Sequence, residues 1–104
     1  MEQIDIHQAK ELIDQGEVTI IDIRDEESYK ESHVECAQSV NESNLEDFLR
    51  KADKESPLIC YCYHGFSSQN AAQFFQEEGF KKVYSIEGGF EAWKTVYPTE
   101  SNVK

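Results

Sequence analysis

The chain has 104 residues, 12% of them aromatic, and a formal net charge of −11 from 21 acidic and 10 basic residues. This size and composition fit one globular domain, and the charge argues against nucleic acids and anionic lipid membranes as partners. No apolar run approaches the roughly 20 residues of a membrane span, and no secretory signal follows Met1. The odd number of cysteines favours reduced thiols, so we expect a cytoplasmic protein.

Short apolar strands alternate with amphipathic helices from the start of the chain. The first helix is predicted to begin after Asp5, which can form a capping box with Gln8, and to end at Gly16. Residues 18–23 are rich in β-branched side chains and predict a buried strand. A short helix capped by Asp25 is expected next.

The second half of the chain continues this alternation. The predicted elements are a weak strand at 37–40, a helix opened by Ser43, a buried strand at 58–62, a helix opened by Ser67 or Ser68 and ended by Gly79, a strand at 82–86, and a last helix containing Phe90, Trp93 and Tyr97 that Pro98 stops. The alternation predicts one α/β domain over residues 1–98, with a parallel sheet covered by helices on both faces. The tail, residues 99–104, is expected to be frayed.

Cys62 lies where the strand 58–62 stops and the next helix approaches, in the stretch CYHGFSS. In open α/β sheets, ligands bind beyond the carboxyl ends of the strands, where N–H groups at a helix start point outward. Gly65 permits the loop to curl around the sulfur, and the amides and the helix dipole would then lower the thiol pKa. We interpret Cys62 as an activated nucleophile. The amides of the candidate anion-binding loop are those of Tyr63, His64, Gly65, Phe66, Ser67 and Ser68.

The alternative for Cys62 is a buried structural thiol, and its position at a strand end does not by itself separate the two interpretations. The glycine-containing loop and the helix that follows favour the nucleophile. Cys60 lies inside the strand and is interpreted as a core residue, while Cys36 is structural or incidental. The cysteines and histidines lack the spacing of zinc ligands, so no metal is expected.

Three motifs occur in the order and with the spacing of the rhodanese family: IDIRD (21–25), CYHGFSS (62–68) and YSIEGGFEAW (84–93). Over nearly its whole length the chain resembles the single-domain thiosulfate sulfurtransferases of the GlpE type. The resemblance implies a rhodanese-like fold with a five-stranded parallel sheet, and a thiosulfate:cyanide sulfurtransferase that needs no cofactor. The Cys62 thiolate would attack the sulfane sulfur of thiosulfate, sulfite would leave, and the Cys62 persulfide would pass its sulfur to cyanide or to a thioredoxin-like dithiol protein.

The chain departs from the common rhodanese pattern in its charges and in one turn. The loop has no cationic side chain unless His64 is protonated, so thiosulfate binding would depend on backbone dipoles and is expected to be weak. Ser32-His33 replaces the usual Gly-His pair, so that turn must have an ordinary backbone geometry. Arg24, between Asp22 and Asp25, is expected to be a structural charge that supports the site indirectly, with contact to an anion as the alternative role.

Rival families share parts of this pattern. Cysteine-dependent phosphatases and arsenate reductases use C-x5-R, in which the arginine clamps a tetrahedral oxyanion, but the sixth residue after Cys62 is Ser68. Mercaptopyruvate sulfurtransferases typically carry a Cys-Gly-Ser/Thr-Gly loop, which CYHGFS does not match. A catalytically dead rhodanese-like binding module is the alternative from another functional class, and the intact cysteine loop disfavours it.

Overall fold

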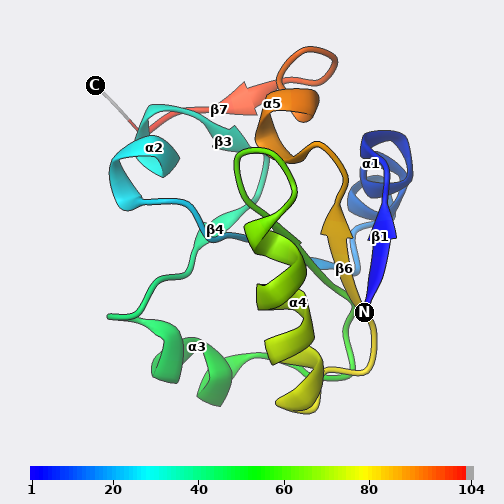
Figure 1. Cartoon of the computed structure of the whole chain (residues 1–104), viewed down its shortest axis with the longest axis vertical. Helices are drawn as coiled ribbons and strands as arrows, with labels where there is room; N and C mark the ends of the chain where they lie inside the picture. Colours follow the sequence, from blue (N-terminus) through cyan, green and yellow to red (C-terminus); the bar gives the residue numbers. More distant parts are fainter. Residues whose placement is uncertain (103–104) are drawn as a thin grey trace.

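A parallel sheet of five strands forms the centre of the computed structural model, which describes residues 1–102. In spatial order its strands are β1 (Glu2–Ile4), β6 (Val83–Ile86), β5 (Leu58–Tyr61), β2 (Thr19–Asp22) and β4 (Gln38–Ser39). All neighbouring strands run parallel, so their carboxyl ends meet at one edge of the sheet (Figure 1). The predicted α/β fold with a five-stranded parallel sheet is confirmed.

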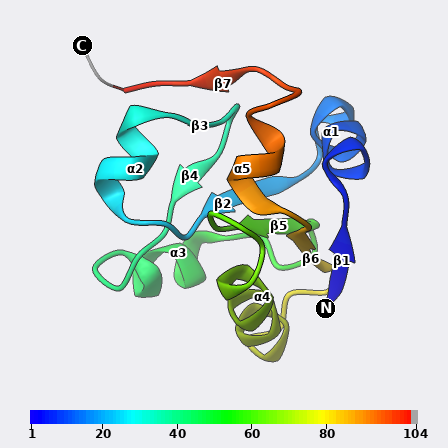
Figure 2. The same ribbon diagram turned by 45° about the horizontal axis from the view of Figure 1, so that its top comes forward.

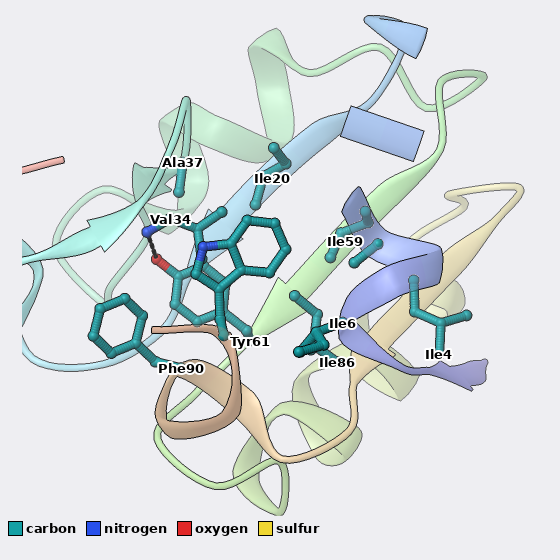
Figure 3. Packing of buried hydrophobic residues seen from close by; sticks show 11 residues of the cluster. Ile4, Ile6, Ile20, Val34, Ala37, Ile59, Tyr61, Ile86 and Phe90 are labelled. Atoms are coloured by element: carbon teal, nitrogen blue, oxygen red, sulfur yellow. Dashed lines mark hydrogen bonds between the residues drawn. The ribbon is translucent and has the colours of Figure 1, made fainter. Parts of the chain in front are cut away.

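Helices cover both faces of this sheet (Figure 2). On one face lie α1 (Ile6–Gln15), α2 (Glu26–Glu31) and α5 (Gly89–Trp93), and on the other lie α3 (Leu45–Lys51) and α4 (Ser67–Glu77). The first core contains Ile59, Tyr61 and Phe90 (Figure 3), and the second contains Cys60 and Phe75. Because side chains alternate along a strand, consecutive residues of β5 belong to opposite cores.

The predicted caps of the first two helices are present. The Asp5 carboxylate accepts a hydrogen bond from the Gln8 amide at 2.8 Å, and the Gln8 side chain accepts one from the Asp5 amide at 2.9 Å. Gly16 ends α1 in the left-handed conformation, with φ of +83°. Asp25 caps α2 by accepting from the Ser28 amide at 3.0 Å. Local sequence therefore determines where both helices begin and where α1 ends.

The predicted start of the third helix was wrong. Asn44, not Ser43, is the residue before α3, and no side chain caps this helix. The Ser43 hydroxyl instead donates to the Asn41 side-chain oxygen at 2.6 Å. This local turn competes with capping because short polar side chains can bond neighbouring backbone and side-chain groups equally well.

The C-terminal segment also differs from the prediction. The last helix, α5, ends at Trp93 and does not include Tyr97; the turn that follows is closed by the amides of Val96 and Tyr97, which both donate to the Trp93 carbonyl, at 3.1 and 2.9 Å. β7 (Thr99–Glu100) then pairs antiparallel with β3 (His33–Val34), so these tail residues are not frayed (Figure 2). The end of the predicted tail, residues 103–104, lies outside the described residues. Within residues 1–102, no helix has the length and apolar character to cross a membrane.

Cys36 occupies the left-handed backbone region, with φ of +69°, between β3 and β4. Its side chain is exposed, and its amide donates to the Glu100 carboxylate at 2.9 Å. The left-handed conformation is unfavourable for a residue with a Cβ atom, because that atom approaches the following carbonyl oxygen. The turn at Cys36 therefore favours glycine.

We predict that Cys36→Gly is more stable than Cys36→Ala by about 1 kcal/mol, because both variants lose the thiol and only glycine removes the Cβ contact. Urea unfolding followed by circular dichroism measures the difference. Equal stabilities of the two variants would contradict a strained backbone at this position.

Candidate active site

The loop that carries Cys62 follows β5 directly and leads into α4 at the carboxyl edge of the sheet (Figure 1). Two amides at the start of α5 hold its backbone. The Phe90 amide donates to the Cys62 carbonyl at 2.8 Å, and the Glu91 amide donates to the Tyr63 carbonyl at 3.0 Å. The backbone of Cys62 is therefore fixed by a helix from a distant part of the sequence.

Two glycines permit this close approach between the loop and α5. Gly65 has φ of +92°, and a Cβ there would lie 2.9 Å from the Gly88 nitrogen. At Gly89, with φ of +58°, a Cβ would lie 2.5 Å from the Cys62 carbonyl oxygen. Real Cβ atoms do not approach other atoms so closely, so a side chain at either position would displace the loop. Sequence reasoning found the role of Gly65 in the loop but not the contact made by Gly89.

Backbone amides and one hydroxyl surround the Cys62 sulfur. The sulfur accepts hydrogen bonds from the Gly65 amide at 3.2 Å and the Ser68 amide at 3.3 Å, and the Ser68 hydroxyl oxygen lies 3.5 Å from it. A backbone hydrogen bond from the His64 amide also lowers the pKa of the Cys62 thiol. Among residues 1–102, the other predicted amides make no hydrogen bond to the sulfur; they are those of Tyr63, Phe66 and Ser67.

The pKa of the Cys62 thiol is lowered from its ordinary value. Burial raises this pKa, since the side chain is only 6% exposed, but the hydrogen bonds from the Ser68 hydroxyl and from the amides of Ser68, Gly65 and His64 have the larger combined effect. In contrast, burial and the nearby charge of Cys62 raise the pKa of the Cys60 thiol. The two cysteines therefore differ chemically, and only Cys62 is prepared to act as a thiolate.

The helix α4 begins at Ser67, within the predicted start, but neither Ser67 nor Ser68 caps it. Phe66 precedes the helix, and its side chain makes no capping hydrogen bond. Ser68 is fully buried in the first turn, where its amide and hydroxyl face the Cys62 sulfur. The sulfur thus takes the place of a cap for the free amide of Ser68. The Ser68 hydroxyl also lies 2.7 Å from the hydroxyl of Ser85, a buried residue that sequence reasoning missed.

The other side chains of the loop point outward. Phe66 is 76% exposed, and His64 is exposed as well. The Tyr63 hydroxyl donates to the Asp25 carboxylate at 2.9 Å and so connects the loop to the start of α2. The exposed side chains of the loop itself therefore include two aromatic rings but no lysine, arginine or carboxylate.

Arg24 lies next to the loop, 5.3 Å from the centre of the Tyr63 ring, and is paired with Asp22. Both side chains are buried, and the Arg24 Nη2 atom lies 2.7 Å from the Asp22 Oδ2 atom. Burial lowers the pKa of the Arg24 guanidinium, but the hydrogen bonds and the charge of Asp22 raise it by more. The pKa of Arg24 is therefore raised overall. Arg24 also donates to the Ser32 carbonyl at 2.6 Å. Ser32 stands where the family usually has the glycine of a Gly-His pair, and an ordinary backbone geometry was predicted there. Its backbone is extended, with φ of −168°.

The comparisons with known proteins agree with this geometry. The family model for the rhodanese-like domain matches residues 5–96. The chain belongs to the rhodanese-like domain family. This rhodanese-like domain is 47% identical over 97 residues to a protein named thiosulfate sulfurtransferase GlpE from Coxiella burnetii (strain RSA 331), with 93% of this chain and 91% of that relative covered.

Two further matches extend the likeness of this rhodanese-like domain. A protein with the same name from Pseudomonas fluorescens (strain SBW25) is 49% identical over 92 residues, covering 88% of this chain and 84% of the relative. A crystal structure of a Bacillus halodurans protein superposes with a TM-score of 0.85 at 31% identity, covering 97% of this chain and 77% of the other.

Removal of the Ser68 hydroxyl in Ser68→Ala is expected to shift the ionisation of Cys62 to higher pH. Because the pKa of the wild-type thiol is lowered, its thiolate is lost only as the pH falls through that pKa. The variant has a higher thiol pKa, so its thiolate is lost at a higher pH. At about pH 6, alkylation of Cys62 by iodoacetamide should be roughly tenfold slower than in the wild type, the effect of one hydrogen bond to a charged group. An unchanged rate–pH profile would show that this hydroxyl does not stabilise the thiolate.

Proposed function

We propose that the protein is a thiosulfate sulfurtransferase that carries sulfur on Cys62. The observation that supports this most directly is the Cys62 sulfur at the end of β5, which accepts hydrogen bonds from the amides of Gly65 and Ser68. The relatives from Coxiella burnetii and Pseudomonas fluorescens, which share about half of the aligned residues, are named thiosulfate sulfurtransferases. The proposed activity combines this geometry with those names.

In the first half-reaction, the Cys62 thiolate attacks the sulfane sulfur of thiosulfate. The sulfur–sulfur bond of thiosulfate breaks, its electron pair leaves with sulfite, and a Cys62 persulfide remains. The amides that stabilise the thiolate would stabilise the charge of the persulfide in the same way as an oxyanion hole stabilises developing charge. The amides of Phe66 and Ser67, at the start of α4, would be available for the added sulfur or for sulfite oxygens.

In the second half-reaction, a thiophilic acceptor takes the outer sulfur and Cys62 returns to the thiolate. Cyanide would leave as thiocyanate, and a thioredoxin-like dithiol protein would take the sulfur on one of its thiolates. The exposed ring of Phe66 would contact such an acceptor at the mouth of the site.

The free thiols of Cys36, Cys60 and Cys62 support the proposed cytoplasmic location.

Intact mass after incubation with thiosulfate, under non-reducing conditions, tests the carrier residue. The wild type should gain one sulfur atom and lose it on addition of cyanide, whereas Cys62→Ser should gain none. Cys36→Ser is the matched control and should gain the sulfur like the wild type. No gain in the wild type would contradict thiosulfate as the donor and leave a binding module or another donor, and a gain in Cys62→Ser would contradict the assignment of the carrier.

Weak binding of thiosulfate is the second expectation of this proposal. Arg24 is occupied by Asp22, the loop offers only neutral dipoles, and the net charge is −11, so the KM for thiosulfate should lie in the millimolar range. A cationic side chain at the exposed position Phe66 should lower it several-fold, because an opposite charge attracts the dianion.

Steady-state transfer of sulfur to cyanide measures this effect in Phe66→Lys, with Phe66→Gln as the uncharged control. Half-saturation of the wild type at micromolar thiosulfate would contradict the dipole-only site. A steep loss of activity with rising salt would also contradict it, since screening beyond about 8 Å should weaken repulsion and not attraction.

A further inference from the structure

Ser85 on β6 is a buried polar residue to which the proposed mechanism gives no role. It is fully buried and pairs with Cys60 of β5, on the sheet face that α4 covers. Its hydroxyl oxygen lies 2.7 Å from that of Ser68, and among residues 1–102 Ser68 is its only hydrogen-bond partner. Because removal of a hydroxyl from water costs free energy, a serine inside this strand requires a physical reason.

Ser68 stands between Ser85 and the reactive sulfur. Its hydroxyl oxygen lies 2.7 Å from the Ser85 hydroxyl oxygen and 3.5 Å from the Cys62 sulfur. The three side chains thus form a continuous hydrogen-bonded row that leads from the interior of the sheet to the site. Each hydroxyl has one hydrogen to donate, so the row has two possible directions.

The two directions differ in how many hydrogens are used. With Cys62 as a thiol, its S–H donates to Ser68 and Ser68 donates to Ser85, which leaves the Ser85 hydrogen without an acceptor among residues 1–102. With Cys62 as a thiolate, the thiol proton has passed to solvent, Ser85 donates to Ser68, and Ser68 donates to the sulfur. Every hydrogen of the row is then used, so the row favours the anion.

We propose that Ser85 is a positioning residue: it donates to the Ser68 oxygen and so turns the Ser68 hydroxyl hydrogen toward the Cys62 sulfur. Ser85 makes no hydrogen bond to the sulfur in the described chain and acts only through Ser68. The proposal rests on the proposed role of Cys62 as the nucleophile. It adds a residue from β6 to a site whose other groups belong to the loop and to α4.

The pH dependence of Cys62 alkylation by iodoacetamide, with peptide mapping by mass spectrometry, tests this role. The midpoint is the pH at which the rate of alkylation is half its maximum. In Ser85→Ala, this midpoint should move to higher pH, and alkylation at about pH 6 should be roughly threefold to tenfold slower. In the Ser68→Ala background, Ser85→Ala should cause no further change, because no hydroxyl remains to be oriented. A shift of the same size in both backgrounds, or no shift in the wild-type background, overturns the proposal.

Two further variants separate positioning from packing. Ser39 lies on β4 of the same sheet, and its buried hydroxyl has no hydrogen-bond partner among residues 1–102, so Ser39→Ala should leave the midpoint unchanged. Ser85→Thr keeps the hydroxyl, so it should keep the wild-type midpoint even where its added methyl group lowers the melting temperature. A midpoint in Ser85→Thr as high as in Ser85→Ala would assign the effect to packing.

Alkylation requires no sulfur donor, so the outcome does not depend on thiosulfate. If the wild type forms no persulfide but the Ser85→Ala midpoint moves as expected, the proposed function fails and the positioning role stands. If the persulfide forms and the midpoint of Ser85→Ala equals that of the wild type, the positioning role fails and the proposed function stands.

Discussion

The buried ion pair between Asp22 and Arg24 connects the sheet to the candidate active site. Asp22 also accepts a hydrogen bond from the Tyr61 hydroxyl at 2.7 Å, so β2 and β5 share one polar group inside the first core. The Arg24 guanidinium lies 4.1 Å from the centre of the Phe90 ring, and the Phe90 amide holds the Cys62 carbonyl. Loss of either charge would leave the other buried and unpaired, which typically costs about 3–5 kcal/mol.

The site stabilises a negative sulfur with neutral groups, in a protein whose net charge is −11. The groups that hydrogen-bond this sulfur are the amides of Gly65 and Ser68 and the hydroxyl of Ser68, at the start of α4. Fixed dipoles act over short distances, so they favour the thiolate without a cation that would attract other anions. Arg24 is buried and paired with Asp22, so its charge is balanced there and the Cys62 sulfur is stabilised by neutral groups alone.

Much of the fold could be predicted from local sequence patterns, and the predictions that failed have identifiable causes. The β-branched strands, the Asp5 and Asp25 caps and the strand-to-helix position of Cys62 are local features, and the structure contains them. The start of α3 was missed because Ser43 bonds Asn41. The pairing of β7 with β3 was missed because each strand has two residues, which is too short for a periodic signal.

The sequence by itself determined the α/β alternation, the place of Cys62 at a strand end and the glycine that lets its loop curl, because each depends on neighbours along the chain. Only the tertiary structure decided that Gly89 touches the Cys62 carbonyl and that Ser68 meets Ser85. These contacts join residues that are far apart in the sequence, and the register of β5 against β6 and the packing of α4 and α5 bring them together. Periodicity reports which face of an element is buried, but it does not report which residue from another element lies against that face.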